Sequence, residues 1–216
     1  MLGGNHGTYA LYSAALNQSV LIFEVLLDYC IVTQESKRIN QNFDERVILY
    51  PFDVSDEYQT FNDLTVVHTY PIDNFVFQKV SVMKIEVEGF EIRALNGALH
   101  VIRQWGVGAI LIEIAAKRWN WNNITLDEGI ALLEHVTSMG KYSSYIIARN
   151  DEACPMSQIS KLDRIIHINY LSMINMQNGK SEVAPQIFRL TEWTTIITQM
   201  PDIDWSCNFW LESALK

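Results

Sequence analysis

The first residues with the types and spacing to do chemistry are the glycine-rich loop G-G-N-H-G at residues 3–7, directly before a helical pattern. Glycines let a backbone approach a ligand closely, and a helix N-terminus offers free N–H groups to a negatively charged group. Glu24 ends the next apolar run, about 20 residues on, where a carboxylate can accept hydrogen bonds from two ribose hydroxyls. This spacing predicts a site for a nucleoside cofactor. A tight turn without a ligand is the alternative.

The elements that must position this loop alternate along the chain. Short apolar runs alternate with helical patterns, which predicts βαβ units, a mostly parallel sheet and a single domain over residues 1–216. We expect strands at 19–24, 47–50, 80–87, 109–114, 142–148 and 207–211, and helices at 8–16, 26–41, 92–105, 126–139 and 191–199. Residues 58–74 are expected to be loop with short extended pieces, and 151–162 irregular, while 164–176 fit no single element.

A second segment carries a more specific pattern, M-K-I-E-V-E-G-F-E at residues 83–91, followed by A-L-N-G-A at 94–98. It closely resembles the K-I-D-V-E-G-x-E signature of FkbM-family methyltransferases and its A/V-L-x-G-A continuation. The run L-I-E-I at 111–114 is similar to the next strand of that family. The loop at 3–7 resembles the family's D-x-G-[AG]-N-x-G, and Phe23-Glu24 resembles its F-E-P. The resemblance runs in order over about residues 1–114 and is weaker beyond them.

The resemblance implies a Rossmann-like class I methyltransferase fold with an antiparallel last strand, and S-adenosylmethionine as cofactor. It also implies methyl transfer to a hydroxyl of a small molecule or sugar. Glu24 would hold the ribose of the cofactor. The segment D-V-S-D at 53–56 resembles the family's A-x-S-D and would place Asp53 and Val54 beside the adenine. The methionine end of the cofactor would be cradled by Gly3, Gly4, Asn5 and Gly7.

Three carboxylates are the candidate catalytic groups: Glu86, Glu88 and Glu113. In the resemblance they lie at the carboxyl ends of two central strands, where ligands of open α/β sheets bind. A carboxylate there can take the proton that a hydroxyl loses on methylation. The alternative is that they cap turns or pair with Lys84 or Arg93. The histidines beyond the loop lack metal-ligand spacing, and we predict no metal site.

An acceptor pocket is one interpretation of Trp119 and Trp121, which follow the strand carrying Glu113; the hydrophobic core is the other.

The sequence departs from the family pattern in three places. Met1 stands where the family loop has its aspartate, Val25 replaces the proline after Glu24, and Glu86 replaces an aspartate. The last change moves a carboxylate by one methylene, a displacement that can lower a reaction rate. We also expect the first strand of the sheet to be lacking, so that the strands at 19–24 and 80–87 face each other with unpaired edges. A truncated start follows from that expectation.

Composition excludes several classes of function. The net charge is -9 and no Lys/Arg cluster is denser than a pair, which disfavours nucleic acid as a partner. No apolar run is long enough to span a membrane. The three cysteines, Cys30, Cys154 and Cys207, are widely spaced and odd in number. They predict reduced thiols, which favours a cytoplasmic location.

Two other functions stay open. A nicotinamide-dependent oxidoreductase would use the same glycine loop and Glu24, but it leaves the segment at 83–91 unexplained. A non-catalytic remnant of the methyltransferase fold would keep the motifs and have lost turnover.

Overall fold

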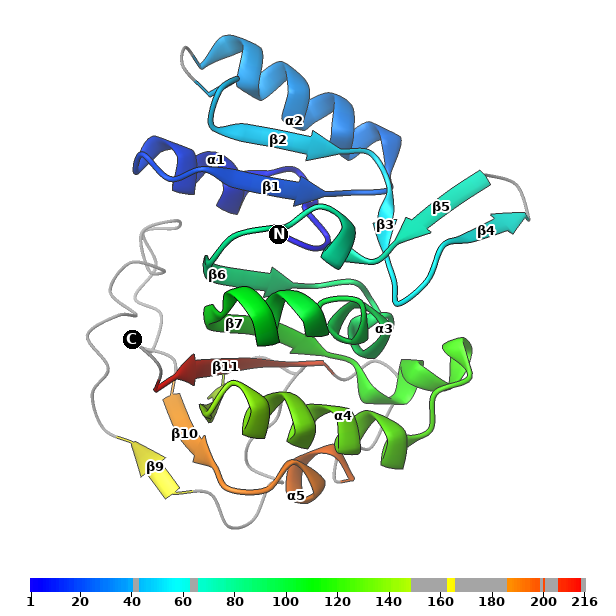
Figure 1. Cartoon of the computed structure of the whole chain (residues 1–216), viewed down its shortest axis with the longest axis vertical. Coiled ribbons are helices and arrows are strands. Elements are labelled where there is room, and N and C mark those ends of the chain that lie inside the picture. The colour runs from blue at the N-terminus through cyan, green and yellow to red at the C-terminus, as the bar shows by residue number, and fades with distance from the viewer. Residues whose placement is uncertain are drawn as a thin grey trace.

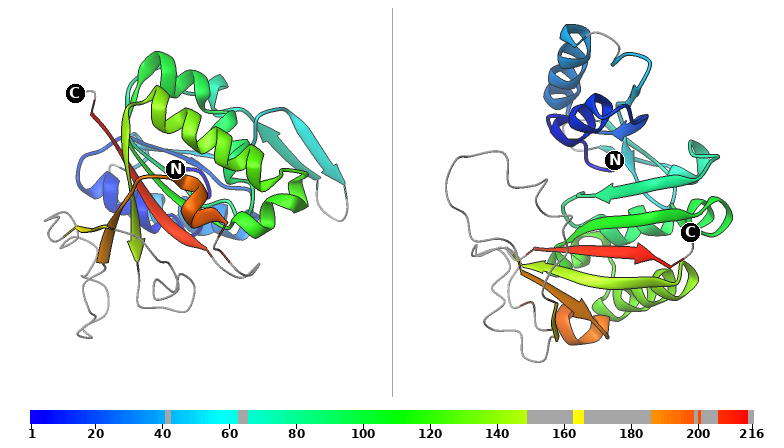
Figure 2. Two further views of the ribbon diagram at one scale, coloured as in Figure 1. Left: turned by 90° about the horizontal axis from the view of Figure 1, so that it is seen from below. Right: turned by 90° about the vertical axis from the view of Figure 1, so that its left-hand side faces the viewer.

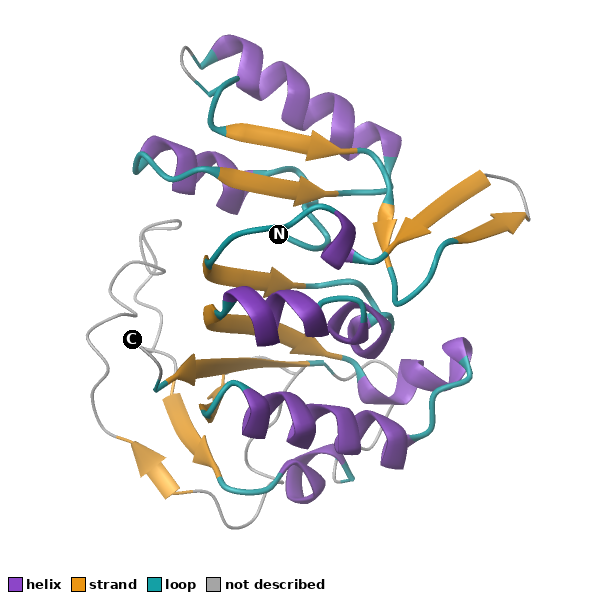
Figure 3. Ribbon diagram, in the orientation of Figure 1, coloured by secondary structure: helices purple, strands orange, loops and turns teal. Residues whose placement is uncertain are grey.

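The computed structural model describes residues 1–40, 43–62, 66–148, 163–165, 186–198, 200 and 206–214. Strands and helices alternate along most of this part of the chain, as Figure 3 shows. The expected α/β class is confirmed.

The N-terminal part contains two strands and two helices close to the predicted bounds (Figure 1). They are α1 (Thr8–Ala15), β1 (Val20–Phe23), α2 (Leu27–Ile39) and β2 (Val47–Tyr50). The two strands are parallel, with Val20 opposite Val47 and Phe23 opposite Tyr50. The inward side chains of the strands pack against Ala10 and Ala14 of α1, which keeps this helix against the sheet.

The second sheet has six strands in the order β6-β7-β11-β8-β10-β9. Their bounds are β6 (Val80–Ile85), β7 (Val107–Ile114), β8 (Tyr142–Ala148), β9 (Asp163–Ile165), β10 (Gln186–Leu190) and β11 (Cys207–Ser213). Strands β6 and β7 are parallel, whereas β11 runs antiparallel to both β7 and β8. The antiparallel last strand is therefore as expected. The sequence did not predict β10, and the expected irregular segment 151–162 lies outside the described residues.

A single residue, Leu2, joins the two sheets. It forms parallel bridges to Phe23 of β1 and Ile85 of β6, and the N-terminus lies between these strands (Figure 1). Its N–H donates to the Lys84 carbonyl (2.8 Å), and its carbonyl accepts from the N–H of Glu86 (3.0 Å). The expected unpaired edges are thus bonded at their carboxyl ends. Among the described residues, no strand pairs with the rest of that edge of β6.

The segment expected to be loop with short extended pieces, residues 58–74, pairs into strands in its described parts, 58–62 and 66–74. Residues 53–74 contain β3 (Asp53–Val54), β4 (Gln59–Asn62), β5 (Val66–Tyr70) and the 3-10 turn η1 (Ile72–Asn74). Strands β4 and β5 form an antiparallel hairpin that projects from the body of the molecule, and β3 pairs in parallel with β5 (Figures 1 and 2). Backbone pairing gives this segment a structure that its mixed side-chain pattern did not show.

The expected helix at 92–105 is interrupted. Helix α3 (Glu91–Asn96) ends at Gly97, and the chain is helical again from Leu99 and continues into η2 (Val101–Trp105). Gly97 lies so close to the segment after β3 that a Cβ there would come within 2.1 Å of the Ser55 carbonyl oxygen. This contact between distant segments accounts for the break.

Three more helical segments follow. They are η3 (Ala116–Asn122), α4 (Leu126–Met139) and α5 (Trp193–Ile197). Helix α4 has the predicted bounds because Thr125 and Glu128 form a capping box at its start. With α3 it covers one face of the central sheet (Figure 2).

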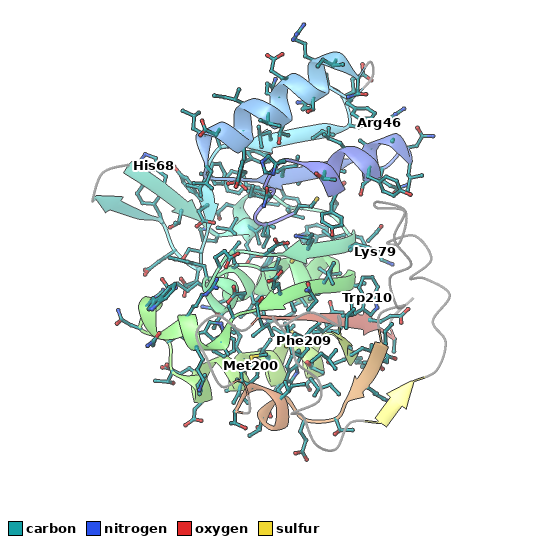
Figure 4. The ribbon with its side chains drawn as sticks, turned by 180° about the vertical axis from the view of Figure 1, so that it is seen from behind. Arg46, His68, Lys79, Met200, Phe209 and Trp210 are labelled. Atoms are coloured by element: carbon teal, nitrogen blue, oxygen red, sulfur yellow. The ribbon has the colours of Figure 1, made fainter. Side chains whose placement is uncertain are left out.

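The hydrophobic core lies under these helices and includes buried residues from Leu2 to Leu211. Figure 4 labels Phe209 and Trp210, consecutive residues of β11 whose side chains take opposite faces of the sheet. Phe209 is fully buried and its ring lies 5.0 Å from that of Trp193, whereas Trp210 is half-buried. No helix in the described part of the chain is long and apolar enough to span a membrane.

The cysteines differ from the expectation. Cys30 is buried and free, but Cys207 is disulfide-bonded, and Cys154 lies outside the described residues. The prediction of reduced thiols is therefore wrong for Cys207. Because disulfides are typical of oxidising compartments, the cysteines no longer support a cytoplasmic location.

Candidate functional site

The glycine loop directly follows Leu2 and packs between the ends of β1 and β6. Gly3 has φ 71°, and a Cβ on it would lie 1.7 Å from the Glu86 carbonyl oxygen. A Cβ on Gly4 would lie 2.2 Å from the Ile22 side chain. A larger residue at either position would push the loop out of this site. Gly7 ends the loop and is the N-cap residue of α1, as the sequence predicted.

Glu24 is buried at the end of β1 and holds the loop through its carboxylate. One oxygen accepts a hydrogen bond from the N–H of Asn5 (2.7 Å), and the other accepts from the N–H of Leu26 (2.8 Å). Each carboxylate oxygen has a further lone pair, so both can also accept from hydroxyls of a ligand. The structure therefore brings together the loop and the acid that the sequence paired.

Asp53 lies near Glu24, while Val54 beside it is fully buried. Burial raises the pKa of Asp53 to about 6; a hydrogen bond from the Val54 N–H to its carboxylate opposes this change, and the negative charge of Glu24 adds to it. The charges of Glu24 and Asp53 are therefore close enough to interact.

An aromatic cluster surrounds this end of the sheet, and the sequence analysis missed it. The ring of Phe23 stacks on Tyr50 at 4.9 Å between centroids and also contacts Phe75 at 5.8 Å. Phe52 lies 4.7 Å from Tyr70. These rings come from β1, β2, β5 and the residues directly after β2 and η1, so no local pattern in the sequence joins them. A feature of the sequence that could have indicated this cluster is the position of Phe23, directly before Glu24.

Glu86 and Glu113 lie at corresponding positions of adjacent strands. Ile85 is opposite Ile112 in the β6–β7 register, and the two glutamates are the next residues along. Glu86 forms an ion pair with Lys84, one of the alternatives that the sequence left open, and Glu113 accepts a hydrogen bond from the Ser206 hydroxyl.

Glu88 is separate from this pair. Its backbone has φ 49°, its side chain is 68% exposed, and it forms an ion pair with Arg118. The alternative partner Arg93 instead pairs with Asp56 at 3.0 Å. The three candidate catalytic carboxylates thus have three different surroundings. In the part of the chain that the structure describes, no group of three or more acidic, histidine or cysteine side chains is placed to hold a metal ion.

The two tryptophans after β7 differ completely. Trp119 is fully buried and its indole N–H donates to Glu91 (2.9 Å), which makes it a core residue. Trp121 is 61% exposed, and the guanidinium of Arg118 lies 5.9 Å from its ring. Of these two tryptophans, only Trp121 presents its ring to solvent. Glu91 is a second residue that sequence reasoning missed, although it lies inside the segment at 83–91.

Comparisons with known proteins agree with this geometry. The model of the methyltransferase FkbM domain matches residues 10–143. The crystal structure of methyltransferase FkbM from Methylobacillus flagellatus KT is similar with a TM-score of 0.54 at 14% sequence identity. The similarity covers 88% of this chain and 42% of that chain, so this chain spans well under half of that protein's length. A comparison with curated proteins gave no match. Since the family model covers more than half of the sequence, the chain belongs to the FkbM methyltransferase family.

Proposed function

We propose that the protein binds S-adenosylmethionine and transfers its methyl group to a hydroxyl of a small molecule or sugar. The position of the glycine loop is the observation that carries this proposal. The strand that follows β1, which is β2, lies on one side of Leu2, and the strand that follows β6, which is β7, lies on the other side. Leu2 lies between them, where the strand order reverses, and the loop follows Leu2 directly. Ligands of open α/β sheets bind outside the carboxyl ends of the strands at such a point.

The residues of the loop and of the neighbouring strand ends fit a nucleoside cofactor. The Glu24 carboxylate is fixed by two backbone N–H groups and would accept hydrogen bonds from the ribose hydroxyls. The aromatic cluster around Phe23 and Asp53 would border the adenine. Gly3, Gly4, Asn5 and Gly7 would border the methionine end. When bound, the cofactor would supply an electrophilic methyl group.

The remaining chemistry belongs to the carboxylates. A hydroxyl that accepts a methyl group must lose its proton, and a carboxylate within hydrogen-bond reach can take it. Glu113 is the strongest candidate base, because its described partner is the neutral hydroxyl of Ser206. Glu86 and Glu88 each already face a cation. No observation favours the oxidoreductase over a methyltransferase.

Glu24 provides a direct test. We expect Glu24→Ala to weaken binding of S-adenosylhomocysteine by roughly 1.5–3 kcal/mol, the range for hydrogen bonds to a charged group. Isothermal titration calorimetry measures this. Glu45→Ala is the matched control, because Glu45 is an exposed carboxylate outside the site. If Glu24→Ala bound as tightly as the control, the ribose would not be held by Glu24.

A further inference from the structure

A buried carboxylate joins the loop after β6 to the segment after β7. Glu91, the first residue of α3, is 1% exposed. One of its oxygens accepts a hydrogen bond from the N–H of Gly89 (2.6 Å), and the other accepts from the indole N–H of Trp119 (2.9 Å). A buried carboxylate normally has its oxygens bonded in this way, and here both partners lie in loops at the carboxyl edge of the sheet.

The same two segments touch at several other points. The side-chain amide of Asn122 donates to the Gly89 carbonyl (2.9 Å), and Arg118 pairs with Glu88. A Cβ on Gly89 would come within 2.8 Å of the Arg118 Cβ, so the backbones are in close contact. Glu88 and Gly89, in the loop after β6, are therefore packed against η3.

The loop needs such support because its backbone is strained. Glu88 has φ 49°, in the left-handed region that only a small share of non-glycine residues adopt. Gly89 follows with φ 103°. Conformations of this kind persist when the surrounding structure fixes them. Two hydrogen bonds hold this backbone: the Phe90 N–H donates to the Val87 carbonyl (3.1 Å) and closes a turn over Glu88 and Gly89, and the Gly89 N–H donates to Glu91.

We propose that Glu91 is a positioning residue: its carboxylate holds the Glu88–Gly89 backbone against η3 and thereby sets the place of the Glu88 side chain. It also steadies the Glu86 carbonyl, against which Gly3 of the cofactor loop packs. The effect on cofactor binding rests on the proposed function, whereas the hydrogen bonds and the support of the loop do not.

An ionised carboxylate is the side chain that this arrangement requires. Both partners of Glu91 are N–H donors, and an ionised carboxylate can accept from both. A glutamine has one accepting oxygen and would turn its NH2 group toward the other N–H, so one bond would be lost, and in a protonated glutamic acid the hydroxyl oxygen is a weaker acceptor than a carboxylate oxygen.

Protonation of Glu91 falls in an accessible pH range. Burial raises its pKa to about 7; hydrogen bonds from the Gly89 N–H and the Trp119 indole oppose this rise, and the negative charge of Glu88 contributes to it. The other charged groups nearby are Arg118 in η3 and Arg93 in α3, which bonds to Asp56 and the Asn122 carbonyl. The support of the loop should therefore be complete above about pH 7 and weaker below it.

Nuclear magnetic resonance of the ¹⁵N-labelled protein observes one of these bonds directly. The chain has 6 tryptophans, and Trp119→Phe identifies the Trp119 indole signal by removing it. We expect this signal to move with a midpoint near pH 7 in the wild type and to be independent of pH in Glu91→Gln. A signal with the same position and pH dependence in both proteins would overturn the proposal.

Hydrogen–deuterium exchange tests whether the bond supports the loop. We expect Glu91→Gln to speed exchange of peptides covering 86–90 and 118–122 by about tenfold, the effect of losing one hydrogen bond. Trp119→Phe removes the indole donor and keeps a smaller aromatic side chain at this buried position, so it gives a second reading even if Glu91→Gln fails to fold. Glu134→Gln on the exposed face of α4 is the control and should leave exchange unchanged. Exchange in both test variants equal to the control would overturn the proposal.

Binding of S-adenosylhomocysteine separates this proposal from the proposed function. We expect Glu91→Gln to bind it about three- to tenfold more weakly than the wild type above pH 7, with less pH dependence below. If the wild type does not bind at all, the proposed function fails, and the resonance and exchange results still decide the role of Glu91. If the wild type binds and Glu91→Gln matches it at every pH, Glu91 does not position the site.

Discussion

At the scale of single residues, Glu24 and Asp53 show how surroundings give two carboxylates different properties. Glu24 has both oxygens on backbone N–H groups, from Asn5 and Leu26. Asp53 accepts one such bond, from Val54, and is largely buried close to the charge of Glu24. Because burial disfavours a charge, the pKa of Asp53 rises to about 6. Asp53 therefore takes up a proton at mildly acidic pH.

This raised pKa predicts a pH-dependent stability. The folded state binds more protons than the unfolded state between the ordinary pKa of 3.8 and about 6, so the contribution of Asp53 to stability falls as the pH rises through this range. Asparagine does not titrate in this range. We therefore expect the free energy of unfolding of Asp53→Asn, relative to that of the wild type, to increase by at most roughly 3 kcal/mol as the pH rises from about 4 to 7. Urea unfolding at the two ends of the range measures this. Asp28→Asn, on the exposed surface of α2, is the control. A difference in free energy of unfolding between Asp53→Asn and the wild type that stays constant with pH would contradict the expectation.

At the scale of elements, the sequence predicted what depends on local pattern. The apolar runs that form β1, β2, β6, β7 and β8, and the capped helix α4, all lie where expected. The helix expected at 92–105 is interrupted at residues 97–98, where Gly97 packs on the Ser55 carbonyl, a contact that no local pattern shows. The same difference between local pattern and distant contacts decides which parts of the candidate site could be predicted. The loop and Glu24 could be predicted from their spacing, whereas the aromatic cluster and the bond between Glu91 and Trp119 join distant segments.

Leu2 is the residue on which the junction of the two sheets depends. It is fully buried between β1 and β6 and bridges both strands: its own N–H and carbonyl bond on the β6 side, and its neighbours Met1 and Gly3 bond to Phe23 of β1. We expect Leu2→Ala to lower the free energy of unfolding by about 2–5 kcal/mol, because it leaves a cavity in a packed core. Leu16→Ala, at a 52% exposed position after α1, should change it by less than about 0.5 kcal/mol. Equal midpoints of the two variants in urea would show that the sheets are held together elsewhere.

At the scale of the whole molecule, the strand order β2-β1, then Leu2, then β6-β7 brings four chain segments to one edge. They are the glycine loop after Leu2, Glu24 after β1, the loop after β6, and the end of β7 with Glu113. The edge carries several carboxylates in a chain of net charge -9, which suits a cofactor with a positively charged sulfonium better than a polyanion. The family match over residues 10–143 spans three of these segments, all but the glycine loop.

The most direct test of this account is a comparison of two ligands by thermal unfolding of residues 1–216. A ligand that binds the folded state raises the melting temperature with its concentration. We predict that S-adenosylhomocysteine raises the melting temperature of the wild type and has less effect on Glu24→Ala, while NAD at the same concentrations has little effect on either. A rise with NAD and none with S-adenosylhomocysteine would contradict the assignment of this site to S-adenosylmethionine.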